Sequence, residues 1–110
     1  HAVALRRDER WLLTRRARTG HWAGMWELPS VEGSQVLDAE ELRKALPIRT
    51  TNLKLVDEFT HLLSHREIRL RIYTARTRQR RGEWRLLGEI EEIAMSSAMR
   101  KAIRRTQEFV

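Results

Sequence analysis

Cysteine is absent from this sequence of 110 residues. Disulfide bridges, thiolate chemistry and an iron–sulfur cluster held by cysteines are therefore excluded from the chain itself. Long apolar runs are missing as well, since no stretch approaches the about 18 residues that a membrane-spanning helix needs. No signal-peptide pattern opens the chain. We therefore expect an intracellular protein without membrane contact, which in a bacterium means a cytoplasmic, nucleoid-associated location.

Lysine is scarce. Only Lys44, Lys54 and Lys101 among the 22 basic residues are lysines, so 19 are arginines, and the net charge is +7. The planar guanidinium fork matches phosphate and guanine edges better than an ammonium group does. Nucleic acid is therefore the expected partner. The alternative explanation of the same count is a GC-rich genome or a hot habitat that favours arginine for solubility. Eight of these arginines lie between positions 66 and 85, which favours a patch.

The length suits one domain that covers residues 1–110. Alternating or short apolar segments predict strands over residues 1–7, 11–16, 25–28, 52–62, 67–73 and 83–87. Asp38 and Glu41 form a capping box for a helix that ends at Pro47, and Ser96 or Ser97 caps a closing helix. Residues 89–94 add a turn or two of helix. We predict an α+β fold with a mixed or antiparallel sheet and about two helices.

A hairpin is predicted at the centre of the chain. Ile68, Leu70 and Ile72 alternate with polar residues, which is typical of a half-buried strand. Ser64 and His65 then fall where this strand and the preceding one reverse, a position where small polar residues hydrogen-bond nearby backbone. A hydroxyl and an imidazole at a sheet tip, beside many arginines, could probe the edge of a base. The simpler reading is an ordinary turn.

Three motifs, in this order, resemble a known family. Gly24-Met25-Trp26-Glu27-Leu28-Pro29 looks like the strand that precedes the catalytic helix of Nudix proteins. The run from Phe59 to His65 is similar to the Phe-x-His-x-Phe-Ser-His loop of MutY-type adenine DNA glycosylases, in their C-terminal domain. Residues 83–101 resemble the closing segment of that domain. The resemblance implies a Nudix-like fold.

Nudix hydrolysis depends on a glutamate-rich helix that holds Mg²⁺ against a pyrophosphate. Its consensus, Gly-x5-Glu-x7-Arg-Glu-x-x-Glu-Glu-x-Gly, is not found here: Gly33 is followed six positions later by Ala39. Glu40 and Glu41 are adjacent and point about 100° apart on a helix, so they cannot clamp one cation together. We expect no metal site and no catalytic residue in the chain.

The resemblance implies recognition of 8-oxoguanine opposite adenine in duplex DNA, as part of base excision repair. Lesion recognition is expected at Ser64 and His65, beside Leu63, which replaces the aromatic residue of the family and weakens any wedging. The expected phosphate contacts are Arg15, Arg16, Arg18, His21 and Arg66. Base removal, and the iron–sulfur cluster that accompanies it in the family, would belong to a catalytic domain outside this chain. No cofactor is expected within the chain, and we expect a monomer.

Two other functions stay open from the residues alone. One is a Nudix hydrolase of oxidised nucleoside triphosphates with unusual metal ligands. The other is a protein-docking module whose arginines meet an acidic partner. Among neighbouring residues, His61 is expected to support the hairpin, Trp26 and Trp84 to lie in the core, and Trp22 to be exposed.

Overall fold

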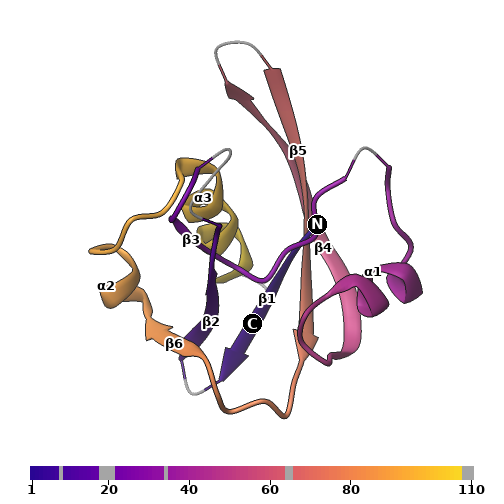
Figure 1. Cartoon of the computed structure of the whole chain (residues 1–110), viewed down its shortest axis with the longest axis horizontal. Helices are drawn as coiled ribbons and strands as arrows, with labels where there is room; N and C mark the ends of the chain where they lie inside the picture. The colour runs from indigo at the N-terminus through magenta and orange to yellow at the C-terminus, as the bar shows by residue number, and fades with distance from the viewer. Residues whose placement is uncertain (8, 18–21, 34, 64–65, 108–110) are drawn as a thin grey trace.

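The computed structural model describes residues 1–7, 9–17, 22–33, 35–63 and 66–107 (Figure 1). Within these ranges, six strands and three helices follow one another. They are β1 (Ala2–Arg7), β2 (Arg10–Arg15), β3 (Trp26–Glu27), α1 (Ala39–Ala45), β4 (Thr51–Leu63), β5 (Arg66–Arg76), β6 (Glu83–Leu86), α2 (Leu87–Ile90) and α3 (Ser97–Thr106). No helix of the described part has the length and apolar character needed to cross a bilayer.

The strands form one mixed sheet. Five of them follow the order β3-β2-β1-β5-β4, and the sixth, β6, also pairs with β2. β1 and β5 pair in parallel at its centre, with Ala2 opposite Ile72 and Leu5 opposite Ala75. The other pairings are antiparallel, and β3 and β6 pair with successive parts of β2. The predicted mixed sheet is therefore confirmed.

Helices cover both faces of this sheet, so the molecule has three layers (Figure 1). Ala2 and Ala4 face the side of α3, whereas Val3 and Leu5 face the side of α1. Side chains alternate between the two faces of a strand. Because all four side chains are buried, both faces of β1 pack against hydrophobic core.

The two longer helices begin where their capping residues predict. The Asp38 side chain accepts from the Glu41 amide at 2.8 Å, and Glu41 Oε1 accepts from the Asp38 amide at 3.2 Å, which completes the capping box. Ser96 caps α3, and the buried stripe of this helix consists of Ala98, Met99, Ala102, Ile103 and Thr106. The third helix, α2, is a single short turn between β6 and α3. It overlaps the turn or two of helix expected over residues 89–94, so the described helices agree with the prediction.

Candidate nucleic-acid interface

The hairpin of β4 and β5 projects beyond the rest of the molecule (Figure 1). Its ladder runs from Thr51–Arg76 to Leu63–Arg66, with irregular register near Asn52 and Val56. Opposite residues share a face, so Phe59, His61, Ile68 and Leu70 point one way. Thr60, Leu62 and Arg69 point the other way, where the Leu62 side chain is 70% exposed. The hairpin therefore carries polar and apolar groups away from the core.

The base of the hairpin is held by α3. Phe59, the first residue of the predicted motif, is buried, and its ring lies under Lys101 Nζ at 4.7 Å and Arg105 Cζ at 4.9 Å. Arg105 also pairs with Asp57 Oδ2 at 2.8 Å. This hydrogen bond, followed by that from the Glu58 amide, lowers the pKa of Asp57 below its ordinary value.

The basic residues of α3 do not all face solvent; they are Arg100, Lys101, Arg104 and Arg105. Arg100 donates to the carbonyl oxygens of Ile90 and Ile93, and so fixes the turn between α2 and α3. Lys101 and Arg105 cover Phe59, and only Arg104 of the four basic residues is classed as exposed. These long side chains pack along apolar surface with their charges outward.

The loop after β2 lies beside the hairpin. The Trp22 and His61 rings are tilted at 59° with centroids 6.4 Å apart, and the Arg16 guanidinium lies 5.9 Å from the Trp22 ring. His61 thus supports the hairpin, as predicted. Trp22 is half-buried against the core cluster, so the prediction of an exposed ring is wrong. The sequence could not reveal this contact because 39 positions separate the two residues.

Arg15 and Arg16, both predicted phosphate contacts, lie in different environments. Arg15 is exposed, with its Nε donating to the Gly24 carbonyl at 3.0 Å. The Arg16 side chain is 16% exposed and pairs with Glu32 and, at 2.9 Å, with Glu27. Hydrogen bonds to Glu32 and then Glu27 raise the pKa of Arg16 above its ordinary value. Arg16 is thus engaged by carboxylates, whereas Arg15 remains accessible to an anion.

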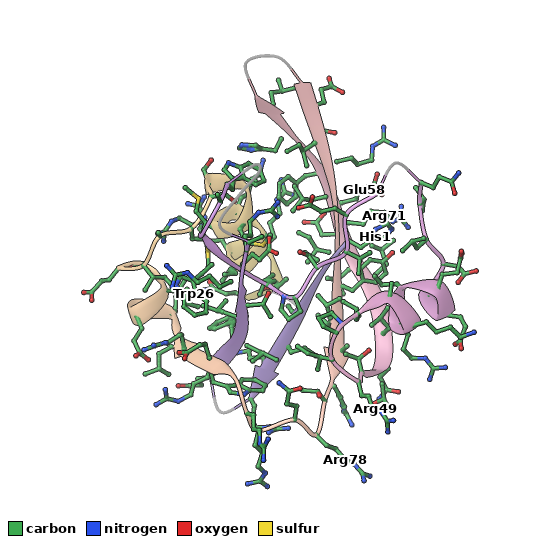
Figure 2. All side chains as sticks on the ribbon, viewed as in Figure 1. His1, Trp26, Arg49, Glu58, Arg71 and Arg78 are labelled. Carbon is green, nitrogen blue, oxygen red and sulfur yellow. The ribbon has the colours of Figure 1, made fainter. Side chains whose placement is uncertain are left out.

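A pocket of about 740 Å³ lies between this loop and the inner part of the hairpin. Arg16, Glu27 and Glu32 line one side, and Ile68, Arg69 and Arg71 line the other. Glu58 binds both hairpin arginines, at 3.7 Å from Arg69 and 2.7 Å from Arg71. Figure 2 shows Glu58 and Arg71 next to each other. The charges that surround the pocket therefore occur largely as ion pairs.

Helix α1, which follows the Gly24–Pro29 motif in the sequence, has its carboxylates already engaged. Both oxygens of Glu40 accept from Arg43 Nη2, at 2.7 and 2.8 Å, and Glu41 completes the cap. Within the described ranges, no group of three or more histidine or carboxylate side chains lies close enough to hold a metal ion. These residues do not fit the Mg²⁺ of Nudix chemistry, which requires several oxygen ligands on one site.

The remaining predicted site residues are located as follows. Leu63 and Arg66 form the last described pair of the hairpin ladder. Ser64 and His65, between them, lie outside the described residues, as do Arg18 and His21 in the loop after β2. The structure brings Trp22, in the loop after β2, against His61 of the hairpin. A joint role of this loop and the hairpin at a lesion stays a prediction.

The mixed sheet with helices on both faces defines a Nudix-type domain. A family model described as "NUDIX domain" matches residues 1–105, so the chain belongs to this family. It is similar to the adenine DNA glycosylase of Homo sapiens, with 31% identity over 84% of this chain and 20% of that protein. The enzyme of Rattus norvegicus is 30% identical over 84% of this chain and 21% of its own length. The chain thus spans about a fifth of these relatives.

Solved structures show the same fold. The C-terminal domain of mouse MUTYH, solved in complex with human PCNA, matches with a TM-score of 0.69 and 23% identity. That match covers 98% of this chain and 86% of the other. A MutT NUDIX hydrolase from Burkholderia pseudomallei matches with a TM-score of 0.62 and 20% identity, over 94% of this chain and 92% of the other. The recognised resemblance to the C-terminal domain of adenine glycosylases is confirmed.

Proposed function

We propose that this domain recognises 8-oxoguanine opposite adenine in double-stranded DNA, as the lesion-sensing part of an adenine DNA glycosylase. The observation that carries the proposal is the projecting hairpin of β4 and β5, whose described ladder ends at Leu63 and Arg66. Similarity to adenine DNA glycosylases supports DNA as the partner. Catalysis, with its iron–sulfur cluster, would belong to a longer protein beyond these 110 residues.

The chemistry at the end of the hairpin suits this task. N7 of guanine accepts a hydrogen bond, whereas N7 of 8-oxoguanine carries a hydrogen and donates one. A serine hydroxyl at position 64 whose own hydrogen is donated to another acceptor can accept from the lesion, and it then meets N7 of normal guanine as one acceptor facing another. An unpaired acceptor costs about 1–3 kcal/mol. That cost is enough for roughly tenfold to hundredfold discrimination.

Phosphate contacts would hold the duplex while the hairpin inspects it. Arg15 is the best supported of the proposed contacts because its guanidinium is exposed at the end of β2. Arg66, Arg18 and His21 are proposed from their sequence positions on the hairpin and in the loop after β2. Arg16 acts instead by fixing Glu27 and Glu32, which shapes the wall of the pocket.

Fluorescence anisotropy on the 110-residue chain tests the proposal. We expect micromolar to weaker binding that falls steeply with salt. The affinity for an 8-oxoguanine:adenine duplex should exceed that for a guanine:adenine duplex by about tenfold. Ser64→Ala should bring this ratio close to one, because the hydroxyl that accepts from N7 is gone.

Thr60→Val provides the matched control, since it removes an exposed hydroxyl lower on the same hairpin. It should preserve the preference for the lesion. Equal affinity of the unaltered chain for both duplexes would refute the proposed function. A preference that survives Ser64→Ala would exclude Ser64 as the reader.

A further inference from the structure

A second group of arginines lies at the end of the sheet opposite the projecting hairpin. We name this group the distal arginine cluster; its members are Arg49, Arg76, Arg78, Arg80 and Arg81, all exposed. Figure 2 shows Arg49 and Arg78 together at this end of the molecule. Strand β5 spans the two ends, and its 11 residues correspond to about 33 Å. The arginine-rich stretch of the sequence is thus divided between two separate surfaces.

Hydrogen bonds fix the backbone of the segment that carries most of this cluster. Arg7 donates to the carbonyl oxygens of Thr77 and, at 3.1 Å, Gln79. The Gln79 side chain and Trp84 Nε1 both donate to the Arg81 carbonyl, at 2.9 and 3.3 Å. The carbonyl oxygens at positions 77, 79 and 81 therefore all have donors in the body of the domain.

This arrangement directs alternate side chains to solvent. Thr77 and Gln79 are half-buried, whereas Arg76, Arg78 and Arg80 are exposed. The Thr77 hydroxyl also donates to the Arg49 carbonyl at 2.8 Å, which brings Arg49 to the same edge. Because the backbone is already held, an anion bound here requires ordering of the side chains alone.

The cluster also differs from other arginines of the domain in its salt bridges to carboxylates. Arg69, Arg71 and Arg85 each lie within 4.0 Å of a carboxylate. In the described part of the chain, none of the five cluster arginines forms a salt bridge. Like charges gathered without counter-charges repel one another, and an anionic partner relieves that repulsion.

We propose that the distal arginine cluster is a second phosphate-binding surface that contacts the backbone of nucleic acid independently of base sequence. Guanidinium forks match phosphate oxygens. Trp84, whose Nε1 donates to the Arg81 carbonyl, has the Arg7 guanidinium over its ring at 5.2 Å, so that face of the ring is not offered to an unstacked base. The cluster arginines therefore suit contact with the phosphate backbone of nucleic acid, which does not depend on base sequence.

The position of the cluster sets how it would act. A duplex held at the projecting hairpin lies about 33 Å away along β5, so the cluster contacts another segment of nucleic acid. Such a second contact keeps the domain near DNA while the hairpin disengages from one base pair and meets another. It therefore adds to affinity on any duplex and leaves lesion preference unchanged.

Salt titration with undamaged duplex tests this surface. Arg78→Gln combined with Arg80→Gln removes two of the charges, and Lys44→Gln combined with Arg104→Gln removes two exposed charges from α1 and α3. We expect the first pair to reduce the slope of log affinity against log salt by about 1.8. The loss of affinity should then be about tenfold larger at 50 mM than at 200 mM salt. The control pair should change the slope by less than half as much.

Two further readouts separate this inference from the proposed function. The affinity ratio between lesion and undamaged duplexes should be the same before and after the Arg78 and Arg80 substitutions, whether or not that ratio exceeds one. Equal slopes for the two variant pairs would overturn the inference. So would tighter binding of polyaspartate than of duplex DNA at equal ionic strength, lost with Arg78 and Arg80, because it would indicate an acidic protein as the partner.

Discussion

At the scale of single residues, Gly82 combines two constraints that no other residue type meets well. Its φ is +107°, a backbone conformation that L side chains rarely adopt. A Cβ built at this position would lie 2.8 Å from Leu12 Cδ1, and Leu12 is fully buried. The glycine therefore lets the basic segment return closely over β2 before β6 begins.

We expect Gly82→Ala to destabilise the domain by about 1–3 kcal/mol, from backbone strain and from displacement of Leu12. Urea unfolding followed by tryptophan fluorescence measures the change. Gly88→Ala is the matched control, because no atom lies within 4 Å of its added Cβ and it sits in α2. That variant should be neutral or slightly more stable. Similar losses in both variants would contradict the geometric explanation.

At the scale of elements, the attachment of α3 to β4 depends on charge as well as on apolar packing. Folding lowers the pKa of Asp57 through its hydrogen bond to Arg105. A group with a lower pKa in the folded state stabilises the fold above its unfolded pKa, and that contribution disappears as pH falls through the folded value. The Asp57–Arg105 contribution should therefore be complete at pH 7 and lost below the ordinary aspartate value of 3.8.

Asp57→Asn should lower the stability at pH 7 by less than about 1 kcal/mol, because both side chains are partly exposed, 24% for Asp57 and 40% for Arg105. At pH 2 the variant and the unaltered chain should unfold at the same urea concentration. Glu92→Gln, at an exposed position that forms no ion pair among the described residues, is the control and should change little at either pH. A difference that persists at pH 2 would assign the effect to packing.

The sequence predicted the elements well because periodicity and capping are local. The capping box at Asp38, the cap at Ser96 and the alternation along β5 appear at the expected positions. Pairings between distant segments were not predictable, among them the parallel contact of β1 with β5 and the packing of Trp22 on His61. The division of the arginines between two ends was missed for the same reason, since it depends on the direction of β5.

At the scale of the whole molecule, the domain has the Nudix fold. The carboxylates of its helix α1 have structural roles, in an ion pair and in the N-terminal cap. We therefore expect no hydrolysis of 8-oxo-dGTP in the presence of Mg²⁺, since Glu40 is held by Arg43 and Glu41 by the cap. Release of pyrophosphate over time measures this. A Nudix hydrolase that retains its glutamates serves as the positive control, and turnover comparable to it would contradict our assignment.

The central parallel pairing also has a consequence for synthesis. Ala2 cannot meet Ile72 until about 70 further residues have been made, which at roughly 5–20 residues per second takes roughly 4–14 s. Throughout that interval one edge of the most apolar strand has no partner, and closing so long a loop makes the final assembly slow. The nascent chain is therefore an expected client of ribosome-associated chaperones, which would shield Ala2–Leu5 until β5 emerges.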